Sequence, residues 1–380
     1  ATLAKKLTRV SVTDDYSNFK DKVDYQEAHV YENGVDVTSQ YNIVNNAGTG
    51  TVTATRKDAA SAPKGTVVLT ATWKVHDDVA SGTKLVNGGS GTLNDETVPT
   101  NTPSITTYTQ TAEKHWVEGT QTVDGKVYID GTLAHAQVTT SLPDPATLTD
   151  KLTDVSITDD YSAFADKVDF QSAQVLENGK DVTDQYTITK QGDKITATRK
   201  DPGSAPAGNA QLLLTFKIHS DVASGTQLEN VGSSTINNHT VSTNKATITT
   251  FKPDPKKDVV VSVDNNKSLN GANIDLNSSF DYKLEGSTVP KNSNGITEYG
   301  FHDDYDQEHD QYNGGYTVLL NSDVTLTDGT VLKKGTDVTK YTTQTIDQDN
   351  GIVDIEFDQD FLTKVDFTNS EFGATAYLKM

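Results

Sequence analysis

One seven-residue phrase occurs three times in this 380-residue chain, and it constrains the fold more than any other feature of the sequence. Val155–Tyr161 reads VSITDDY, Val10–Tyr16 reads VSVTDDY, and Tyr299–Tyr305 keeps the same skeleton as YGFHDDY. In each copy apolar residues alternate with small or polar ones, which is typical of a strand with one buried face. The phrase therefore predicts three related β-domains.

The same alternation places the first aspartate of each copy on the apolar face and the second toward water. The three inward positions are Asp14, Asp159 and Asp303. A carboxylate in an apolar core is unfavourable unless it is paired, hydrogen-bonded or protonated. The alternative is that each strand ends before the pair, which leaves both aspartates in a solvated turn.

A long tandem repeat surrounds the first two copies. Asn33–Thr38 matches Asn178–Thr183 at an offset of 145, whereas Thr53–Asp58 is identical to Thr196–Asp201 at an offset of 143. The second copy has therefore lost two residues in a turn. This register predicts that equivalent residues superpose, namely Asp14 on Asp159, Tyr16 on Tyr161, Trp73 on Phe216 and Asn87 on Asn230.

The composition suits thin β-sandwiches with polar outer faces. Hydrophobic residues make up 34% of the chain, and the formal net charge of −21 makes direct contact with nucleic acid unexpected. The absence of cysteine excludes disulfides and thiolate metal sites. No apolar run is long enough to cross a bilayer, so no membrane insertion is expected, and no secretion signal or anchor is visible.

The repeats predict three domains, at residues 1–109, 110–252 and 253–380, joined by short proline-bearing connectors. Connectors this short predict a semi-rigid, elongated row. Only the middle domain has both a segment that precedes its aspartate-bearing strand, from about residue 111 to 145, and a late asparagine-bearing segment that follows it. The first domain is therefore predicted to be incomplete at its N-terminal end, and the third at its C-terminal end.

Local signals within the domains predict hairpins and a few helical turns. Asn33–Gly34, Asn178–Gly179 and Asp328–Gly329 lie between apolar runs and favour hairpin turns, because these residues tolerate positive φ. Short helical turns are predicted within residues 15–23, 160–168 and 358–365, the last with Phe361 and Leu362 packed inward.

Five segments of residues 251–380 match a known family and occur in that family's order: Pro255–Val259, Tyr299–Asp306, Val324–Val331, Lys334–Thr339 and Phe357–Leu362. Through them, residues 251–380 resemble the third C-terminal domain of the antigen I/II-type adhesins, which are wall-anchored surface proteins of streptococci and related Gram-positive bacteria. The two upstream repeats resemble, more loosely, the preceding C-terminal domains of that family and the aggregation-substance adhesins of enterococci.

The resemblance implies an all-β chain of tandem immunoglobulin-like antiparallel β-sandwiches at the bacterial cell surface. Such domains form the stalk below an adhesive head, and the full-length protein contacts ligands on host or neighbouring cells. The rival hypothesis is that these domains themselves bind a host glycoprotein or carbohydrate. A pure stalk should lack a sizeable concave pocket or an exposed apolar patch, whereas a binding module should have one on a single domain.

Several members of the family carry a spontaneous isopeptide bond between a lysine and an asparagine, promoted by an aspartate. Strand parity favours Asn230 and Asn87 as the asparagines, with Asn244 and Asn101 as alternatives, and Lys126 competes with the favoured lysine of the middle domain. The complete predicted set is Lys114, Asp159 and Asn230, and the partial sets are Asp14 with Asn87 and Lys257 with Asp303. The alternative is that these are ordinary surface lysines and asparagines.

No enzymatic activity is expected, because no nucleophile–base pair and no phosphate-binding loop stands out in the sequence. The acidic run at Asp303, Asp304 and Asp306 is a candidate calcium site through oxygen ligands, and the resemblance supports it, since the family's C-terminal domains bind calcium. It lacks the EF-hand pattern, and a merely solvated acidic loop is the alternative. No other cofactor is expected.

Overall fold

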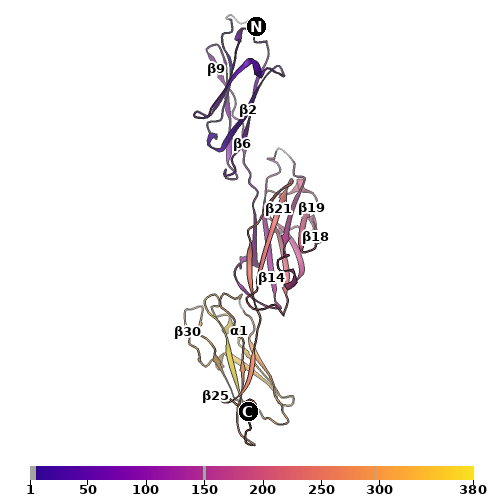
Figure 1. Cartoon of the computed structure of the whole chain (residues 1–380), viewed down its shortest axis with the longest axis vertical. Coiled ribbons are helices and arrows are strands. Elements are labelled where there is room, and N and C mark those ends of the chain that lie inside the picture. Colours follow the sequence, from indigo (N-terminus) through magenta and orange to yellow (C-terminus); the bar gives the residue numbers. More distant parts are fainter. Residues whose placement is uncertain (1–5, 149–150, 295) are drawn as a thin grey trace. The chain divides into compact units, whose positions relative to one another are not determined.

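The computed structural model describes residues 6–148, 151–294 and 296–380, and these residues form an all-β chain (Figure 1). Residues 1–5, 149–150 and 295, which belong to the three predicted domains, lie outside the described residues. The chain divides into two compact units, residues 1–109 and residues 110–380. The second unit holds two separate apolar cores, which we assign to a middle domain (110–252) and a third domain (253–380).

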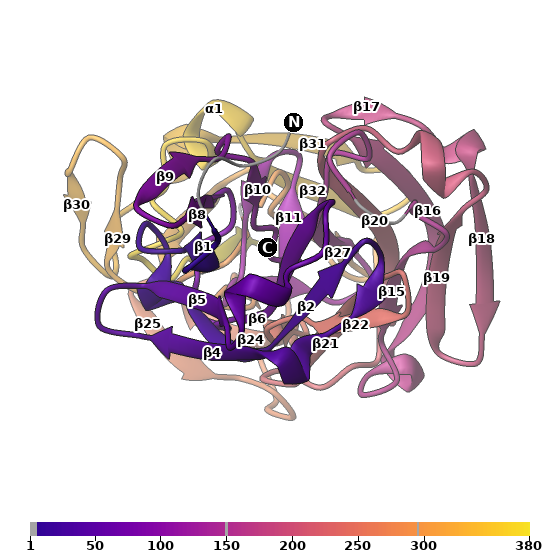
Figure 2. The ribbon, with the colours of Figure 1, turned by 90° about the horizontal axis from the view of Figure 1, so that it is seen from above.

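The first unit contains antiparallel sheets in the orders β4-β5-β1-β8-β9, β3-β2-β6 and β10-β7. Figure 2 shows β4, β5, β1 and β8 side by side in indigo and violet. The strands are β1 (Val10–Asp15), β2 (Val23–Glu32), β3 (Val35–Asp36), β4 (Tyr41–Asn46), β5 (Thr51–Arg56), β6 (Val67–Val75), β7 (Lys84–Val86), β8 (Gly88–Leu93), β9 (Glu96–Pro99) and β10 (Ser104–Thr106).

The middle domain packs a sheet of order β12-β11-β14-β20-β16-β17 against one of order β13-β23-β21-β15-β19-β18, with β22 on β21. Its strands pair antiparallel except β13, which runs parallel to β23. They are β11 (Ala112–Glu118), β12 (Gln121–Thr122), β13 (Val127–Ile129), β14 (Leu133–Leu142), β15 (Val155–Asp160), β16 (Val168–Glu177), β17 (Lys180–Asp181), β18 (Tyr186–Gln191), β19 (Lys194–Arg199), β20 (Gly208–Ile218), β21 (Gln227–Ile236), β22 (His239–Ser242) and β23 (Ala246–Phe251).

The third domain has sheets of order β25-β24-β26-β33-β28 and β27-β32-β31, together with the hairpin β29-β30. Its short helix α1 (Gln359–Leu362) buries Phe361 and Leu362, as the sequence predicted. The strands are β24 (Lys256–Ser262), β25 (Asn265–Ser268), β26 (Asp281–Glu285), β27 (Gly300–Asp304), β28 (Tyr316–Leu320), β29 (Val324–Thr325), β30 (Val331–Leu332), β31 (Thr342–Asp347), β32 (Ile352–Phe357) and β33 (Ala374–Lys379).

The structure confirms the predicted register between the first unit and the middle domain. Asp14 lies opposite Val52, and Asp159 lies opposite Ile195, which is the equivalent position of the repeat. Both copies carry an irregularity at the same place in β2 and β16. Trp73 packs on the rings of Tyr16, Phe19 and Tyr25, as Phe216 packs on those of Tyr161, Phe164 and Phe170. The repeat therefore determines equivalent aromatic cores.

The predicted turns are also confirmed. Asn33 and Gly34 have φ of 53° and 85°, and Asn178 and Gly179 have φ of 50° and 80°, so both pairs occupy the left-handed region that a tight hairpin requires. The predicted helical turns appear as single 3-10 turns at Lys20–Lys22 and at the equivalent place in the middle domain.

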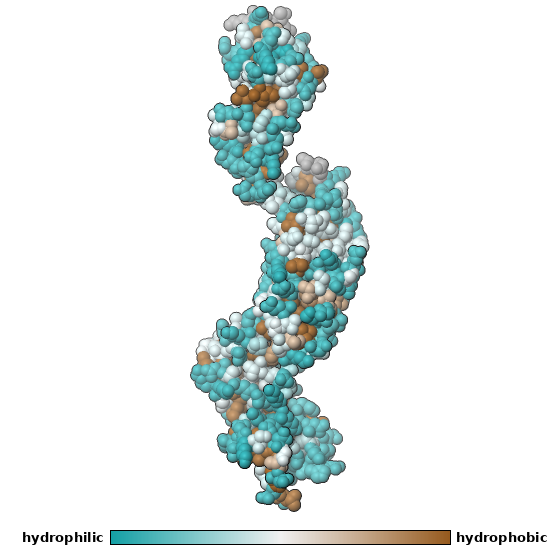
Figure 3. Space-filling view, in the orientation of Figure 1, coloured by the Kyte–Doolittle hydropathy of each residue, from teal (hydrophilic) through white to brown (hydrophobic). Residues whose placement is uncertain are grey.

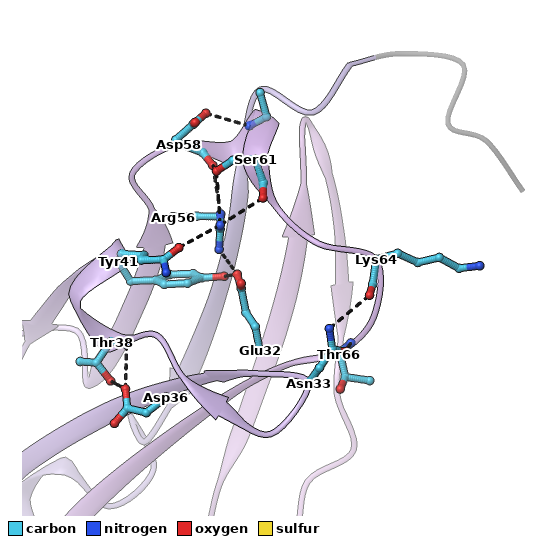
Figure 4. Close-up of polar contacts among 12 residues, drawn as sticks. Glu32, Asn33, Asp36, Thr38, Tyr41, Arg56, Asp58, Ser61, Lys64 and Thr66 are labelled. Atoms are coloured by element: carbon cyan, nitrogen blue, oxygen red, sulfur yellow. Dashed lines mark hydrogen bonds and ion pairs between the residues drawn. The ribbon is translucent and has the colours of Figure 1, made fainter.

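A buried ionic cluster lies at one end of the first unit (Figure 4). The Arg56 guanidinium pairs with the Glu32 carboxylate, which also accepts a hydrogen bond from the Tyr41 hydroxyl at 2.7 Å. Arg56 donates as well to the backbone carbonyls of Asp58 and Ser61. The cluster thereby ties β2, β4 and β5 to the turn that leads into β6. Arg199, Glu177 and Tyr186 form the same cluster in the middle domain.

The middle and third domains meet through a short backbone ladder. The N–H of Val127 donates to the carbonyl of Asn292, and the N–H of Asn294 donates to the carbonyl of Val127. The Asn292 side chain donates to the carbonyl of Gly125 at 2.7 Å. Ile129 and Phe251 of the middle domain pack against the core of the third domain. Polar and apolar contacts thus hold these two domains together.

Candidate functional site

Lys114 and Asp159 meet in the centre of the middle domain. Lys114 lies on β11 and shares its inward parity with Trp116, and Asp159 lies on β15 in the facing sheet. Both side chains are fully buried, and the Lys114 ammonium nitrogen Nζ donates to the Asp159 oxygen Oδ2. The first aspartate of the repeated phrase therefore points into the core, as strand parity predicted, and the solvated-turn alternative is wrong here.

Asn230 lies on β21, the strand that pairs with β15, and its side chain is also fully buried. Within the described part of the chain, neither atom of its amide has a hydrogen-bond partner, and Asp159 Oδ1 has none either. Buried amides are nearly always hydrogen-bonded, so an unpaired one next to a carboxyl requires an explanation. The structure thus pairs Lys114 with Asp159 and places the third predicted residue, Asn230, buried on the neighbouring strand.

Burial shifts the pKa values of both members of the pair toward their neutral forms. It lowers the pKa of Lys114 and raises the pKa of Asp159, because both charged forms lose their hydration. Each partner's charge opposes the other's shift, but desolvation is the larger influence on both groups.

Asn244 and Lys126, the alternative asparagine and lysine of the middle domain, have other roles in the structure. The Asn244 side chain accepts from the backbone N–H of Lys114 at 2.8 Å and donates to its carbonyl at 2.8 Å, so it positions β11. Lys126 lies at the surface, where its ammonium donates to the Thr368 hydroxyl of the third domain at 3.3 Å. Neither alternative belongs to the buried set. The sequence alone did not reveal the positioning role of Asn244.

The first unit contains the aspartate and the asparagine of an equivalent set. The Asn87 amide donates to Asp14 Oδ2 at 3.0 Å. Asp14 Oδ1 and Asn87 Oδ1 are buried, and neither has a partner among the described residues. Burial raises the pKa of Asp14, although the Asn87 hydrogen bond opposes the shift. The predicted partial set of Asp14 and Asn87 is thus assembled.

In the third domain Lys257 pairs with Asp303, the second predicted partial set. Asp303 is buried, but the Lys257 side chain is 42% exposed and lies over the Tyr282 ring, 4.2 Å from its centroid. A half-exposed ammonium keeps much of its hydration, so this pair differs from the fully buried pair of the middle domain.

The calcium site at Asp303, Asp304 and Asp306 stays a prediction, and the structure gives the three carboxylates different surroundings. Asp303 is turned into the core toward Lys257, while Asp304 on the other face of β27 is exposed. Asp306 binds the His309 ring at 2.8 Å. Strand alternation therefore separates the carboxylates. In residues 6–148, 151–294 and 296–380 there is no group of three or more acidic or histidine side chains placed to hold a metal.

Comparison with known proteins gives the family of residues 108–380. Residues 108–249 match the family described as the cell surface antigen I/II C2 terminal domain, and residues 254–380 match the family described as the cell surface antigen C-terminus. These two regions are antigen I/II-type C-terminal domains. A helix that could span a membrane does not occur in the described part of the chain.

Solved structures of antigen I/II C-terminal domains share this fold. The C-terminal domain of the Streptococcus agalactiae AgI/II polypeptide BspA matches with a TM-score of 0.61 and 23% identity, over 71% of this chain and 90% of that one. The C-terminal domain of the Streptococcus pyogenes antigen I/II-family protein AspA matches with a TM-score of 0.59 and 24% identity, over 70% and 90%. They confirm the predicted all-β, immunoglobulin-like fold.

This chain is also similar to a curated relative, the aggregation substance of Enterococcus faecalis. The two are 33% identical over 221 residues, which correspond to 56% of this chain. The match spans only 17% of that relative's length. The resemblance predicted from the sequence is therefore confirmed at the level of these domains.

The paired arginine clusters were missed by the sequence analysis, although a signal was present. Arg56 and Arg199 fall inside the identical TATRKD segments, and Glu32 and Glu177 precede the matching asparagine–glycine turns. In each copy the arginine and the glutamate fall on positions whose neighbours on the same strand face are apolar, which was the available signal. The partner itself depends on which strands are neighbours, which the segments do not reveal.

Proposed function

We propose that this chain is a load-bearing stalk segment of a cell-wall-anchored Gram-positive adhesin, crosslinked in its middle domain by an isopeptide bond between Lys114 and Asn230. The observation that carries the proposal is the buried triad of Lys114, Asp159 and Asn230 with its unpartnered amide. The membership of residues 108–380 in surface-antigen families supports the location. The adhesive contacts with host or neighbouring cells then belong to the full-length protein.

The reaction needs only the three side chains. Proton transfer to Asp159 leaves a neutral Lys114 amine, whose lone pair attacks the side-chain carbonyl carbon of Asn230. The protonated Asp159 carboxyl donates a hydrogen bond to the developing oxyanion, where charge builds up in the transition state. Asp159 then relays a proton from the attacking nitrogen to the departing amide nitrogen. The C–N bond to lysine forms, the bond to the amide nitrogen breaks, and one ammonia leaves.

The bond would join β11, the first strand of the middle domain, to β21, a late one. It closes a loop of more than a hundred residues, and a crosslink of that span stabilises a fold by about 4–5 kcal/mol in the chain-entropy model. The bond also prevents the two strands from separating when the chain is pulled. Both effects suit a segment that transmits tension.

The joint between the middle and third domains supports the same role. Backbone hydrogen bonds at Val127 and the side-chain hydrogen bond of Asn292 link the two domains. A joint made only of a flexible linker would pivot freely. We therefore propose that residues 110–380 respond to load as one body.

An intact mass spectrum of the purified chain tests the crosslink. The parent chain is expected to weigh one ammonia less than its sequence. Asn230→Ala and Lys114→Met variants should each show their full sequence mass, and a digest of the parent should contain one peptide pair joined at Lys114 and Asn230. A parent chain at full sequence mass would overturn the proposal. Lys126→Met is the matched control and should keep the deficit.

The rival hypothesis, that a domain itself binds a ligand, predicted a pocket on a single domain, whereas grooves occur on both the first unit and the third domain. The first unit has a groove of about 290 Å³ lined by Phe19, Trp73, Leu85 and Ile105. A pure stalk domain was expected to lack such a feature. Because the lining is mostly apolar, it suits a polypeptide better than a carbohydrate. A glycan array probed with the chain would support the carbohydrate version only if Trp73→Ala abolished the signal.

A further inference from the structure

Seven asparagines of the chain are followed by a glycine, and these pairs can modify themselves. They begin at Asn33, Asn87, Asn178, Asn270, Asn294, Asn313 and Asn350. A glycine has no side chain to keep its backbone nitrogen away from the preceding asparagine amide. That nitrogen attacks the side-chain carbonyl carbon, the new C–N bond closes a succinimide ring, and one ammonia leaves. Water then opens the ring and gives aspartate or isoaspartate.

The two hairpin asparagines are held out of this reaction. The Asn33 amide donates to the carbonyl of Lys64 at 3.2 Å and accepts from the N–H of Thr66 at 3.1 Å. The Asn178 amide makes the equivalent two bonds in the middle domain, at 3.0 Å and 2.9 Å. Neither side chain can turn back toward its glycine nitrogen without losing both bonds.

Two more pairs are restrained in other ways. The Asn87 amide donates to the Asp14 carboxylate at 3.0 Å. The Asn350 amide donates to the Asp347 carboxylate at 2.8 Å, and the glycine that follows it is buried. The pair that begins at Asn294 includes residue 295, which lies outside the described residues.

Asn270 and Asn313, both in the third domain, lack such restraints within the described part of the chain. Both side chains are exposed, and teal, hydrophilic residues cover much of the visible face of this domain in Figure 3. Their hydrogen bonds come from the backbone, since the N–H of Asn270 donates to the Ser268 hydroxyl and that of Asn313 to the Lys379 carbonyl. The following glycines have φ of 71° and 78° and open space where a Cβ would lie. Each amide is therefore free to meet the next backbone nitrogen in water.

We propose that Asn270 and Asn313 are self-modifying sites, which convert with time to aspartate or isoaspartate while the hairpin asparagines stay intact. The reaction uses only the chain and water. Base accelerates it, because the attacking backbone nitrogen must lose its proton. The conversion is independent of the proposed crosslink, which involves a different asparagine.

The two sites differ in what the conversion does to the fold. Isoaspartate adds one carbon to the backbone after Asn313. On one side of that point the N–H of Asn313 donates to the Lys379 carbonyl at 2.9 Å, and on the other the Gly315 carbonyl accepts from the Lys379 N–H at 3.0 Å. A longer backbone cannot keep both bonds to β33 in register. Asn270 lies in an exposed turn over residues 269–272, outside the strands, so conversion there leaves the sheet unchanged.

Ageing of the full 380-residue chain in warm buffer at about pH 8, followed by peptide mapping, tests the sites. Asn270 and Asn313 should convert at least tenfold faster than Asn33 and Asn178. In a chain kept unfolded in guanidinium, all four should convert at similar rates, because only the fold separates them. Conversion of Asn270 and Asn313 no faster than that of the hairpin pair in the folded chain would overturn the proposal.

The same mass spectra keep this result apart from the crosslink. Each conversion exchanges an NH2 group for an OH group, which is a small gain in mass, whereas the crosslink loses a whole ammonia. The conversions also accumulate during ageing, whereas the crosslink deficit is expected in the freshly purified chain.

The effect on β33 is tested by calorimetry before and after ageing. The aged parent should show a lower melting temperature for the third domain, and Asn313→Gln should prevent the loss because the longer side chain does not form the five-membered ring readily. Asn270→Gln is the matched control and should lose stability as the parent does. Fresh Asn313→Asp, which has the new charge without the added carbon, should melt as the fresh parent does. An aged parent with Asn313 converted and an unchanged melting temperature would show that the assignment to β33 is wrong.

Discussion

The first unit and the middle domain have nearly the same repeat, yet only one of them has a closed core. Phe216 is fully buried among Trp116, Tyr161 and Phe164, whereas the equivalent Trp73 stays partly exposed beside Tyr16. The difference lies in residues 110–142, which supply β11 and β14 to the middle domain. A repeat sequence can thus determine strands and turns completely while its burial depends on residues outside it.

The largest expected difference between the two regions concerns the asparagines. Asn230→Ala removes the proposed crosslink but keeps the Lys114–Asp159 pair, so the middle domain should lose about 4–5 kcal/mol of stability. Asn87→Ala removes one hydrogen bond and should lower the stability of the first unit by about 0.5–1.5 kcal/mol. Calorimetry of the full chain would resolve the two transitions. Equal losses would contradict the comparison.

The aromatic cores provide the next contrast. Phe216→Ala should destabilise the middle domain by about 3–5 kcal/mol, because a fully buried ring leaves a cavity. Trp73→Ala should lower the stability of the first unit less, since solvent already reaches that ring. Guanidinium denaturation followed by far-UV circular dichroism measures both. A larger loss of stability for Trp73→Ala than for Phe216→Ala would contradict the expectation that the more exposed ring contributes less to packing.

A smaller effect is expected from pH. Burial raises the pKa of Asp14 above its value of 3.8 in the unfolded chain. At pH values between 3.8 and the higher pKa of the folded state, the folded first unit keeps a proton on Asp14 that the unfolded chain has released. Its stability therefore falls as pH rises through that window. Asp14→Asn should raise the melting temperature of the first unit at pH 7, and the gain should shrink toward pH 4. A gain independent of pH would contradict this assignment.

The smallest effect is expected from calcium. With Asp303 turned toward Lys257 and Asp306 bound to His309, adding calcium should leave the melting temperature of the third domain unchanged. Ligand linkage requires a rise if the loop binds the ion. A rise in the parent chain that Asp304→Asn and Asp306→Asn abolish would support the calcium prediction made from the sequence.

The sequence by itself determined the features that depend on neighbouring residues. Alternation along a strand fixed the inward direction of Lys114, Asp159 and Asn230, because side chains change face at every residue. The Asn33–Gly34 turn followed from the tolerance of these residues for positive φ. The family resemblance followed from short segments that keep their order along the third domain.

Only the tertiary structure decided which inward side chains meet. Parity favoured Asn230 but left Asn244 as an alternative, and the structure places Asn230 on the strand that pairs with that of Asp159, whereas the Asn244 side chain binds the backbone of Lys114. Parity likewise did not separate Ile105 from Ile248, although one is exposed and the other buried. The physical reason is that strand direction is local, whereas burial and pairing depend on strands that lie far apart in the sequence.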